Sequence, residues 1–355
     1  MTMPSQSFWQ GRRVFLTGHT GFKGGWASIW LHRLGAVITG YSLDPPTTPS
    51  LFQVAGVEDL VEKHHIADIR DHAGLADAMA AAAPEIVIHM AAQPLVRLSY
   101  TQPVETFDIN VLGTVNVLEA ARRVDSIRAL VSVTTDKCYQ NREWNWSYRE
   151  SDALGGHDPY SASKACAEIV TAAYRSSFAA RTGLAIASAR AGNVIGGGDW
   201  SLDRLLPDSF AAWDQGRTTL IRRPSAVRPW QHVLEPVCGY LMLAEALVSR
   251  STEVANAWNF GPNELDTQPV GYIQDRLVQL LPGYRWERDA DEGVHEAGLL
   301  KLDSARARTL LGWQSRWSLD EALLQTATWH RAWRGGEAML DVTRGQIAAY
   351  EALRG

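Results

Sequence analysis

The seven-residue segment GHTGFKG, residues 18–24, constrains the fold of this chain more than any other feature. Its glycines stand at the first, fourth and seventh places, directly after the apolar run 14–16 and before a helical pattern. Glycines at this spacing let backbone N–H groups approach a pyrophosphate closely, and the following helix points its positive end at the same charge. The strand–turn–helix context favours a dinucleotide-binding turn, in a GxxGxxG variant, over a plain glycine-rich turn.

Strand-like apolar runs alternate with helical patterns through the first half of the chain. The runs lie at 14–16, 37–41, 86–90, 130–133 and 184–187, and long helical patterns cover 107–121 and 161–178. Continuous apolar runs are typical of parallel strands that are buried on both faces. The sequence therefore predicts an α/β fold with a Rossmann-type, doubly wound parallel sheet.

The pattern changes near residue 193, where Gly and Trp become frequent and loops interrupt the alternation. We predict a dinucleotide-binding Rossmann domain over 8–192, with a strand that returns to the sheet near 228–262. The segments 193–227 and 263–355 would form a smaller mixed α/β cap that binds the substrate. Within the cap, the capping box SLDE that starts at Ser318 predicts the start of a late helix.

Composition excludes several classes of function. The 355 residues carry a formal net charge of −5 and no basic run, so nothing favours nucleic acid as a partner. No apolar stretch reaches the roughly eighteen residues that a membrane span needs, and no signal peptide is recognisable. Cys138, Cys166 and Cys238 lack CxxC spacing, which favours reduced thiols in the cytoplasm and argues against a zinc site.

Acidic residues after the second and third strands could complete a cofactor site. Asp44 is placed to accept hydrogen bonds from an adenosine ribose, although an Asp followed by two prolines is equally plausible as a turn residue. The lack of Arg or Lys beside it favours NAD over NADP. Asp68 and Ile69 could flank the adenine ring, with a solvated loop as the alternative for Asp68.

Tyr160 and Lys164 stand four residues apart in the segment YSASK, so on a helix they share one face. The lysine charge would favour the phenolate, and the tyrosine could then take a proton from a hydroxyl group while hydride leaves its carbon. An ordinary surface Tyr/Lys pair is the alternative. We favour catalysis because a preceding strand ends in TTDKCY, which adds Thr135, Asp136 and Lys137 at the edge where open α/β sheets bind ligands.

The GxxGxxG and YxxxK motifs, with Asn110 in the helix FDINVLGTVNVLEA, resemble the extended short-chain dehydrogenases that modify nucleotide sugars. The resemblance runs from about residue 11 to the segment LLGW…SLDEAL, which is nearly the whole chain. Within that family, the segments GHTGFKG, TTDKCY, ARAGNVIGGGDW and RPWQHVLEP are most similar to the CDP-glucose 4,6-dehydratases. The resemblance also implies a homodimer, in which helices around 111–121 and 165–174 pair across a two-fold axis.

The resemblance implies roles for individual residues. Tyr160 would be the base for oxidation at sugar C4, and Lys164 would hold the nicotinamide ribose. Thr135 would bond to the 4-hydroxyl, and Asp136 would be the general acid on the departing 6-hydroxyl. The residues expected along the cofactor are Gly18, His19, Gly21, Phe22, Lys23, Gly24, Ala91 and Ala92. Those expected on the sugar nucleotide are Arg190, Asn193, Arg204, Arg228 and His232, with a structural hydrogen bond as the alternative for His232 and with Trp200 and Trp230 as further pocket residues.

Lys137 departs from part of this family. The dTDP-glucose and GDP-mannose dehydratases carry Glu at this place, as the base that removes the C5 proton, whereas CDP-glucose enzymes share the lysine. A lysine can be a base only if burial and a neighbouring cation lower its pKa. Its charge could equally steady an enolate or the Asp136 carboxylate, and both roles stay open.

The resemblance thus implies conversion of CDP-D-glucose to CDP-4-keto-6-deoxy-D-glucose, with tightly bound NAD regenerated in each turnover. The alternatives are a dehydratase for another nucleotide sugar, a 4-epimerase, and a non-catalytic dinucleotide sensor on the same fold.

Overall fold

A seven-stranded parallel sheet is the framework of the computed structural model, which describes residues 3–290 and 298–353. Its strands are β1 (Arg13–Thr17), β2 (Val37–Ser42), β3 (Lys63–Ile66), β4 (Ile86–His89), β5 (Ala129–Val133), β6 (Ala185–Ala191) and β10 (Ala257–Phe260). They lie in the order β10-β6-β5-β4-β1-β2-β3, and all neighbouring strands run parallel. The predicted doubly wound Rossmann-type fold is confirmed. The strand order reverses at β1, and such sheets bind ligands at the carboxyl ends of the strands beside this point.

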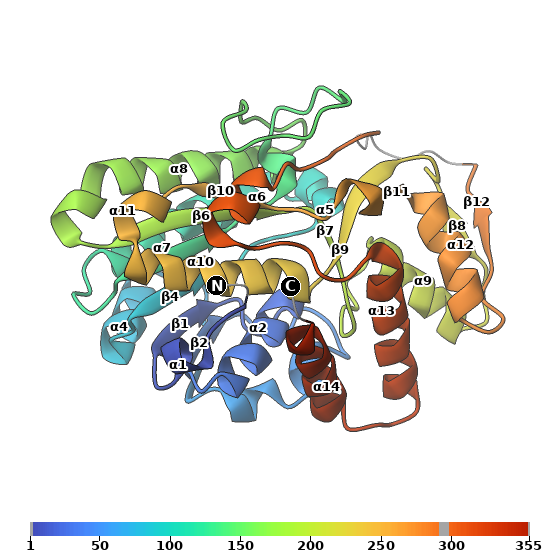
Figure 1. Cartoon of the computed structure of the whole chain (residues 1–355), viewed down its shortest axis with the longest axis horizontal. Coiled ribbons are helices and arrows are strands. Elements are labelled where there is room, and N and C mark those ends of the chain that lie inside the picture. The colour runs from blue at the N-terminus through green and yellow to red at the C-terminus, as the bar shows by residue number, and fades with distance from the viewer. Residues whose placement is uncertain (1–2, 291–297, 354–355) are drawn as a thin grey trace.

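Helices cover both faces of the sheet, as Figure 1 shows for α8 and α2. The long helices of this half are α2 (Phe22–Arg33), α4 (His72–Ala82), α7 (Gly113–Ala121), α8 (Pro159–Thr182) and α10 (Leu234–Ser249). Successive residues of a strand point to opposite faces. Val14 and Leu16 therefore belong to one apolar core with α2 and α10, whereas Phe15 between them belongs to a second core with α4, α7 and α8.

Local sequence signals set the ends of α8, which carries the YSASK segment. Asp158 caps the helix by accepting a backbone hydrogen bond at 2.9 Å, Pro159 occupies the first turn, and Gly183 ends the helix with a φ of +69°. The helix predicted over 161–178 is confirmed. The helix predicted over 107–121 is present too, although its first turn is π-helical.

The cap contains two small sheets and three helices. Its elements are β7 (Asn193–Ile195), β8 (Thr219–Ile221), β9 (Val227–His232), β11 (Thr267–Pro269), β12 (Trp286–Arg288), α9 (Leu205–Asp214), α12 (Val270–Leu280) and α13 (Leu319–Arg334). One sheet has the order β11-β9-β7, and the other pairs β12 with β8. The predicted capping box is confirmed, because the Ser318 side chain accepts the Glu321 N–H at the start of α13. Leu206, Ile273 and Leu323 lie in the apolar core of the cap.

The end of the chain returns to the first half. Helix α14 (Met339–Ala352) packs against α2, and the Trp30 indole N–H donates to Glu351 Oε1 at 2.8 Å. The rings of Trp30 and Tyr350 meet edge to face, with centroids 5.7 Å apart. Helix α14 also packs against α13 of the cap, where the Trp329 indole N–H donates to Thr343 Oγ1 at 2.9 Å, so it bridges the two halves. The boundaries given above for the two domains stay a prediction.

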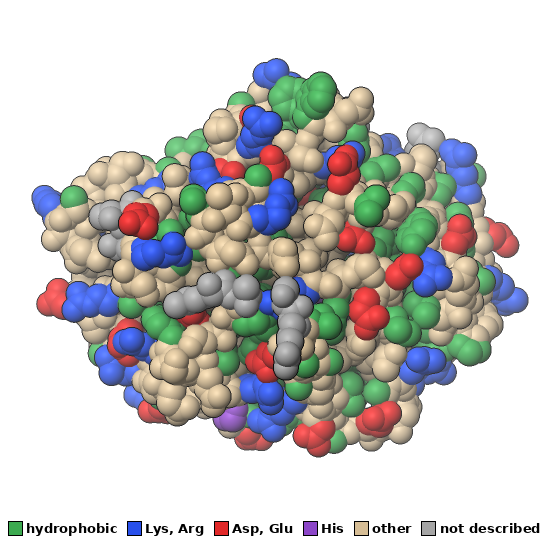
Figure 2. Space-filling model, in the orientation of Figure 1, with side chains coloured by type: hydrophobic (Ala, Val, Ile, Leu, Met, Phe, Trp, Pro, Cys, Tyr) green, Lys and Arg blue, Asp and Glu red, His purple; other side chains and the backbone are tan. Residues whose placement is uncertain are grey.

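Short helical segments connect the larger elements. They are α1 (Gln6–Trp9), α3 (Leu51–Val54), α5 (Val96–Thr101), α6 (Pro103–Phe107), α11 (Ser251–Val254), the 3₁₀ segments Val57–Leu60, Asp136–Cys138 and Glu264–Asp266, and the π-helical segments Asp108–Leu112 and Ala307–Leu311. Among the described residues, no helix has the length and apolar character needed to cross a membrane. The face drawn in Figure 2 intersperses basic and acidic side chains, so it carries no field of one sign.

Candidate active site

A cavity of about 1250 Å³ lies where the carboxyl ends of the sheet strands face the cap. The sheet half contributes the 18–24 turn, residues that follow β2, β4 and β5, and the start of α8. The cap contributes residues of β7, α9, β8 and β9. The cavity therefore occupies the ligand-binding edge of an open α/β sheet.

The 18–24 turn forms one wall of this cavity, and two of its glycines have no room for a side chain. Gly18 has a φ of +78°, and a Cβ there would lie 2.7 Å from the Ala91 nitrogen. A Cβ on Gly24 would lie 2.0 Å from the Gly18 carbonyl oxygen. Gly21, the residue before the first turn of α2, faces the cavity with only one contact at 3.4 Å. The turn thus brings backbone and a helix N-terminus to the cavity, which is the geometry that binds a pyrophosphate.

Gly24→Ala should destabilise the protein, because the added methyl group would overlap the Gly18 carbonyl oxygen. Overpacking of this kind costs about 1–3 kcal/mol, which thermal unfolding would show as a lower Tm. Gly21→Ala is the matched control, since its methyl group would stand 3.4 Å from the same oxygen. We expect the control to keep its free energy of unfolding within about 0.5 kcal/mol of the wild-type value, and so to keep a similar Tm. It should bind the dinucleotide more weakly, because the added methyl group faces the cavity. Equal Tm values for the two variants would contradict this description of the turn.

Most of the residues expected along the cofactor line the cavity. They are Gly18, Gly21, Phe22, Lys23, Gly24, Asp44, Asp68, Ile69, Ala91, Ala92 and Lys164. Asp44 is exposed, whereas Asp68 is engaged with Arg70, whose Nη2 lies 2.6 Å from Asp68 Oδ2. Burial, together with the charges of Arg204 and Lys164, lowers the pKa of Lys23 to about 8.

The His19 side chain lies beneath the turn rather than in the cavity. It is fully buried, its Nε2 lies 2.6 Å from His64 Nδ1, and a Cβ on Gly40 would overlap its ring. Burial and the neighbouring His64 and His65 lower the pKa of His19 to about 3, so the ring is neutral. The expectation that this side chain lies close to the cofactor pyrophosphate is therefore corrected, because the ring supports the turn from below.

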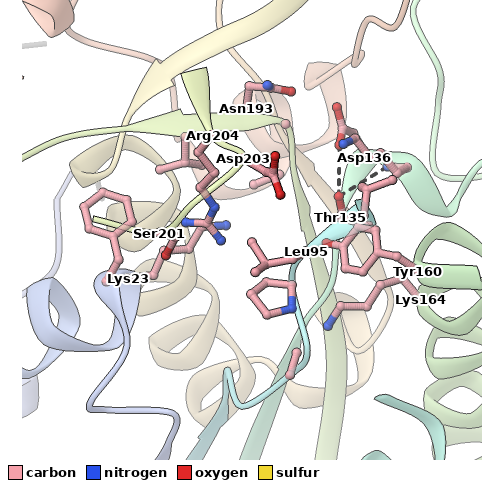
Figure 3. A pocket seen from close by; sticks show the side chains of 18 of the residues that line it. Lys23, Leu95, Thr135, Asp136, Tyr160, Lys164, Asn193, Ser201, Asp203 and Arg204 are labelled. Carbon is pink, nitrogen blue, oxygen red and sulfur yellow. Dashed lines mark hydrogen bonds between the residues drawn. The ribbon is translucent and has the colours of Figure 1, made fainter. Parts of the chain in front are cut away.

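Thr135, Asp136, Tyr160 and Lys164 lie together on one side of the cavity, as Figure 3 shows. The sequence-based prediction that these residues share one site is in line with this geometry. Tyr160 is buried and hydrogen-bonds with Thr135. Burial raises the pKa of Tyr160 to about 12, although the hydrogen bond with Thr135 opposes the rise.

Lys164 lies one helical turn after Tyr160 and lines the same cavity. Its Nζ donates to the Val133 carbonyl oxygen at 3.4 Å, and burial lowers its own pKa to about 8. Burial is the largest influence on the pKa of both groups, and the role of the lysine charge in favouring the phenolate stays a prediction. A tyrosine accepts a proton only as the phenolate, so a base role for Tyr160 needs positive charge beside the phenol.

Asp136 has the properties of a buried acid. The residue is 1% exposed, and its Oδ1 accepts the Thr135 hydroxyl at 3.0 Å. Burial raises the pKa of Asp136, against the opposing charge of Lys137. Its Oδ2 has no hydrogen-bond partner among the described residues and lies beside Gly192, which lines the cavity. A carboxyl group that retains its proton in such a place can serve as a general acid.

Asn110 supports the site from behind. Its Nδ2 donates to Ser163 Oγ of α8 at 2.8 Å and to the Gln93 carbonyl oxygen at 3.1 Å, and its Oδ1 accepts the Gln93 N–H at 2.9 Å. These bonds join the catalytic helix to the loop that follows β4. Asn110 is buried and lies outside the cavity lining.

The residues expected on the sugar nucleotide divide into two groups. Asn193, Arg204, Arg228 and Trp230 line the cap side of the cavity, with Arg204 across from Tyr160 in Figure 3. Arg204 is also ion-paired with Asp199, with 2.8 Å between Nη1 and Oδ2.

Three residues expected at the substrate side lie outside the cavity, which corrects those expectations. Arg190 is buried in an ion pair with Glu168 below the catalytic residues. His232 is fully buried, with its ring centroid 5.6 Å from that of Trp26, and Trp200 packs against Trp329. In each case the side chain is held by core contacts that only the folded chain brings together.

Sequence reasoning missed several polar residues of the cavity wall. Arg97 of α5 and Asp203 of the cap form an ion pair of 2.7 Å, and both line the cavity. Asp208 lines it too, and burial and Asp203 raise the pKa of Asp208 to about 6. The adjacent Arg222 and Arg223 were visible in sequence only as part of a loop. No sequence signal marks the Arg97–Asp203 contact, which joins positions 106 residues apart.

Comparison with known proteins places this fold and site in a family. A family model described as GDP-mannose 4,6 dehydratase matches residues 15–326, which is most of the chain. The chain belongs to this family.

Two curated relatives extend the match of this GDP-mannose 4,6-dehydratase family member. The CDP-glucose 4,6-dehydratase of Salmonella typhimurium is 50% identical over 354 residues, which are 98% of either chain. The dTDP-glucose 4,6-dehydratase of Streptomyces antibioticus is 30% identical over 269 residues, which are 74% of this chain and 75% of the relative.

Solved structures show the same fold. The UDP-glucose 4-epimerase of Thermotoga maritima with UDP-glucose has a TM-score of 0.77 and 20% identity, over 90% of this chain and 99% of its own. The dTDP-glucose 4,6-dehydratase of Bacillus anthracis in complex with NAD has a TM-score of 0.74 and 18% identity, over 93% and 100%. At these identities the likeness concerns the fold.

Proposed function

We propose that this family member is an NAD-dependent hydro-lyase that converts CDP-D-glucose to CDP-4-keto-6-deoxy-D-glucose. The observation that carries the proposal is the 50% identity, over nearly the whole chain, to the CDP-glucose 4,6-dehydratase of Salmonella typhimurium. The geometry supports it, because Tyr160, the buried Asp136 and the lysines Lys137 and Lys164 line one cavity beside a turn suited to a pyrophosphate.

The residues present fit the dinucleotide. Gly18 and Gly24 hold the backbone in a turn that no side chain obstructs, and Asp44 offers a carboxylate to a ribose at the end of β2. NAD, when bound, supplies the acceptor and later the donor of the hydride. Lys164 lies where it can bond to the hydroxyls of the nicotinamide ribose.

Oxidation at C4 comes first in the proposed reaction. Tyr160 accepts the proton of the sugar 4-hydroxyl as the C4 hydride leaves, with Thr135 bonded to the same oxygen. A neutral phenol cannot take up a proton, so Tyr160 must enter this step as the phenolate. Burial raises its pKa to about 12, and positive charge from Arg204 and Lys164 would have to favour the phenolate form.

Loss of water follows. The C4 ketone acidifies the C5 hydrogen, whose proton passes to a base in the cavity as Asp136 donates its proton to the departing 6-hydroxyl. The hydride would then return to C6 while that base gives the proton back to C5. Exchange with solvent would move the proton held by Tyr160 to Asp136, so the sugar loses one water with no net redox change. Burial raises the pKa of Asp136, which extends the pH range over which it holds the proton that elimination needs.

For Lys137 the structure favours the electrostatic role. Its charge opposes the rise in the pKa of Asp136, so the two side chains interact. We therefore expect Lys137→Met to slow elimination while C5 deuterium exchange from solvent continues in the bound 4-keto sugar. Loss of that exchange, measured by NMR with the wild-type enzyme as control, would instead identify Lys137 as the C5 base.

Product analysis tests the proposed function. CDP-glucose incubated with the enzyme and NAD should yield a sugar nucleotide lighter by one water, as detected by mass spectrometry. A panel of CDP-, dTDP-, GDP- and UDP-hexoses compares kcat/KM among nucleotides. A 4-epimerase would leave the mass unchanged, and a non-catalytic sensor would leave every sugar nucleotide intact.

We further propose a homodimer that works in the cytoplasm. Support comes from three strongly exposed apolar residues on neighbouring helical segments: Val104 is 82% exposed, Leu112 55% and Ile169 56%. Helix α8 packs beside the segments that carry the other two residues, so these side chains can form one surface that a second copy would cover. The described cysteines are unpaired, in keeping with a reducing compartment.

Ile169→Glu should weaken the dimer, because it places a carboxylate in an apolar interface. Sedimentation velocity would show the mass falling from that of two chains to that of one. Leu265→Glu is the matched control, since Leu265 is 86% exposed on a cap segment away from α8. A wild-type protein that sediments as a monomer would overturn the proposed assembly.

A further inference from the structure

A buried ion pair lies below the catalytic residues and takes no direct part in the proposed chemistry. Arg190 Nη2 of β6 is 2.7 Å from Glu168 Oε2 of α8, and the two side chains are 4% and 2% exposed. Neither residue lines the cavity. Burial opposes ionisation of Glu168, but Arg190 and its hydrogen bonds lower the pKa, so the carboxylate is charged. A buried pair of this kind is weak evidence for stability, because apolar replacements are often neutral or stabilising.

The pair reaches both ends of the catalytic segment. Thr134, directly before the catalytic Thr135, donates its hydroxyl to Glu168 Oε1. Arg190 Nη1 donates to the hydroxyl of Tyr139 at 2.7 Å, on the far side of the 3₁₀ turn that holds Asp136. Segment 135–138 is therefore flanked by two hydrogen bonds to one ion pair, from Thr134 to Glu168 and from Arg190 to Tyr139.

Further bonds anchor the pair to the sheet. Ser188 Oγ of β6 donates to Glu168 Oε2 at 2.6 Å. The Tyr139 hydroxyl in turn donates to Asn259 Oδ1 of β10 at 2.7 Å. The catalytic segment thus takes its position from β6, β10 and α8 together.

Glu168 also stands one helical turn after Lys164 on α8, so the two side chains share a face. Burial lowers the pKa of Lys164, and the Glu168 carboxylate opposes that effect. The other ionisable groups that face Lys164 are Tyr160 on the same helix, Cys138 after β5, Lys23 of α2 and His89 of β4. The negative charge of Glu168 therefore acts on Lys164 from the same helix.

We propose that the Glu168–Arg190 ion pair positions the catalytic machinery, by fixing both ends of segment 135–138 and by placing a carboxylate on the face of α8 that carries Lys164. Glu168 and Arg190 are positioning residues, since neither touches the cavity. The inference rests on the proposed dehydratase function for its kinetic readout.

Glu168→Gln tests the electrostatic part, because it removes the charge but keeps the shape and an acceptor oxygen. The pKa of Lys164 should fall, so the alkaline limb of the kcat–pH profile should move to lower pH. A shift of one unit from about 8 would lower kcat about fivefold at pH 8, with KM for CDP-glucose nearly unchanged. An unmoved limb in a folded variant would overturn this part.

Glu235→Gln is the matched control for a buried glutamate outside the site. Glu235 of α10 is fully buried and accepts the Tyr350 hydroxyl at 2.6 Å and the Trp317 N–H at 2.8 Å. This control should alter the Tm without moving the pH limb. A limb that moves equally in both variants would show that general destabilisation, rather than the charge of Glu168, sets the profile.

The double variant Glu168→Leu/Arg190→Met tests the mechanical part and should keep its fold, because no charge is left unpaired. Amide hydrogen exchange of peptides covering 134–139 should become faster, and kcat should fall at constant KM. Wild-type exchange and kcat in this variant would refute the inference. A wild-type enzyme with no activity on any nucleotide sugar would refute the proposed function alone, since hydrogen exchange still reports on the segment.

Discussion

Replacing Tyr160 with phenylalanine should lower kcat for CDP-glucose by about 10²–10⁴-fold, the range expected when a general base is lost. The phenolic oxygen is the group placed to take the 4-hydroxyl proton, and it is bonded to Thr135 within the cavity. Without it, the first hydride transfer has no proton acceptor. Reduced cofactor should therefore fail to form in a single turnover, as followed by NADH absorbance.

Binding should survive the Tyr160→Phe change, because the phenyl ring keeps its packing. Isothermal titration with CDP would show affinity close to that of the wild type. Tyr272→Phe is the matched control, since Tyr272 bonds to Asp320 in the cap and lies outside the cavity lining. Full activity in Tyr160→Phe, with the control also active, would contradict the proposed role.

Asp136→Asn should block a later step and so give a different signature. An amide cannot donate the proton that the departing 6-hydroxyl needs, so dehydration should fall by about 10²–10⁴-fold. Oxidation at C4 does not require this acid. A single turnover should therefore build up reduced cofactor and a 4-keto sugar that keeps its 6-hydroxyl, as seen by absorbance and mass spectrometry.

The pH dependence follows from the same carboxyl group. Burial raises the pKa of Asp136, so its proton is present at low pH and is lost as pH rises through that raised value. The elimination step, followed in a single turnover, should weaken on that alkaline side. Asp136→Asn should remove this pH dependence of elimination and leave that of the oxidation step, which involves Lys164. Asp266→Asn is the control, because Asp266 is also buried but bonds to the Leu319 N–H outside the cavity. Normal dehydration by Asp136→Asn would exclude it as the acid.

The sheet and the cofactor turn were predictable because their signals are local. The apolar runs alternate directly with helical patterns, and each run became a strand of the parallel sheet. The GHTGFKG segment carries its own steric requirement, since Gly18 and Gly24 admit no side chain. The shared site of Tyr160 and Asp136 was accessible too, because parallel strands end at one edge.

Contacts between distant segments were not predictable in this way. Arg190 lies on a strand that ends at the site, yet its side chain is ion-paired with Glu168 in the interior. Neither sequence segment indicates that these two side chains would be buried against each other. The sequence likewise did not decide whether His232 contacts a ligand or lies in the core. In the structure its ring is buried against Trp26. The pKa of Tyr160 depends mainly on how deeply the folded protein buries the phenol. The sequence indicated only that a lysine stands four residues away.

The packing of α14 onto α2 bears on how such a chain is made. Trp30, on the helix that begins at the glycine turn, packs edge to face against Tyr350 and donates to Glu351, which are synthesised about three hundred residues later. Until those residues are synthesised, the Trp30 ring lacks its contact with Tyr350. A chain that ends before Met339 would lack α14 and so expose apolar residues of α2. We expect chaperones to bind the incomplete chain at this surface.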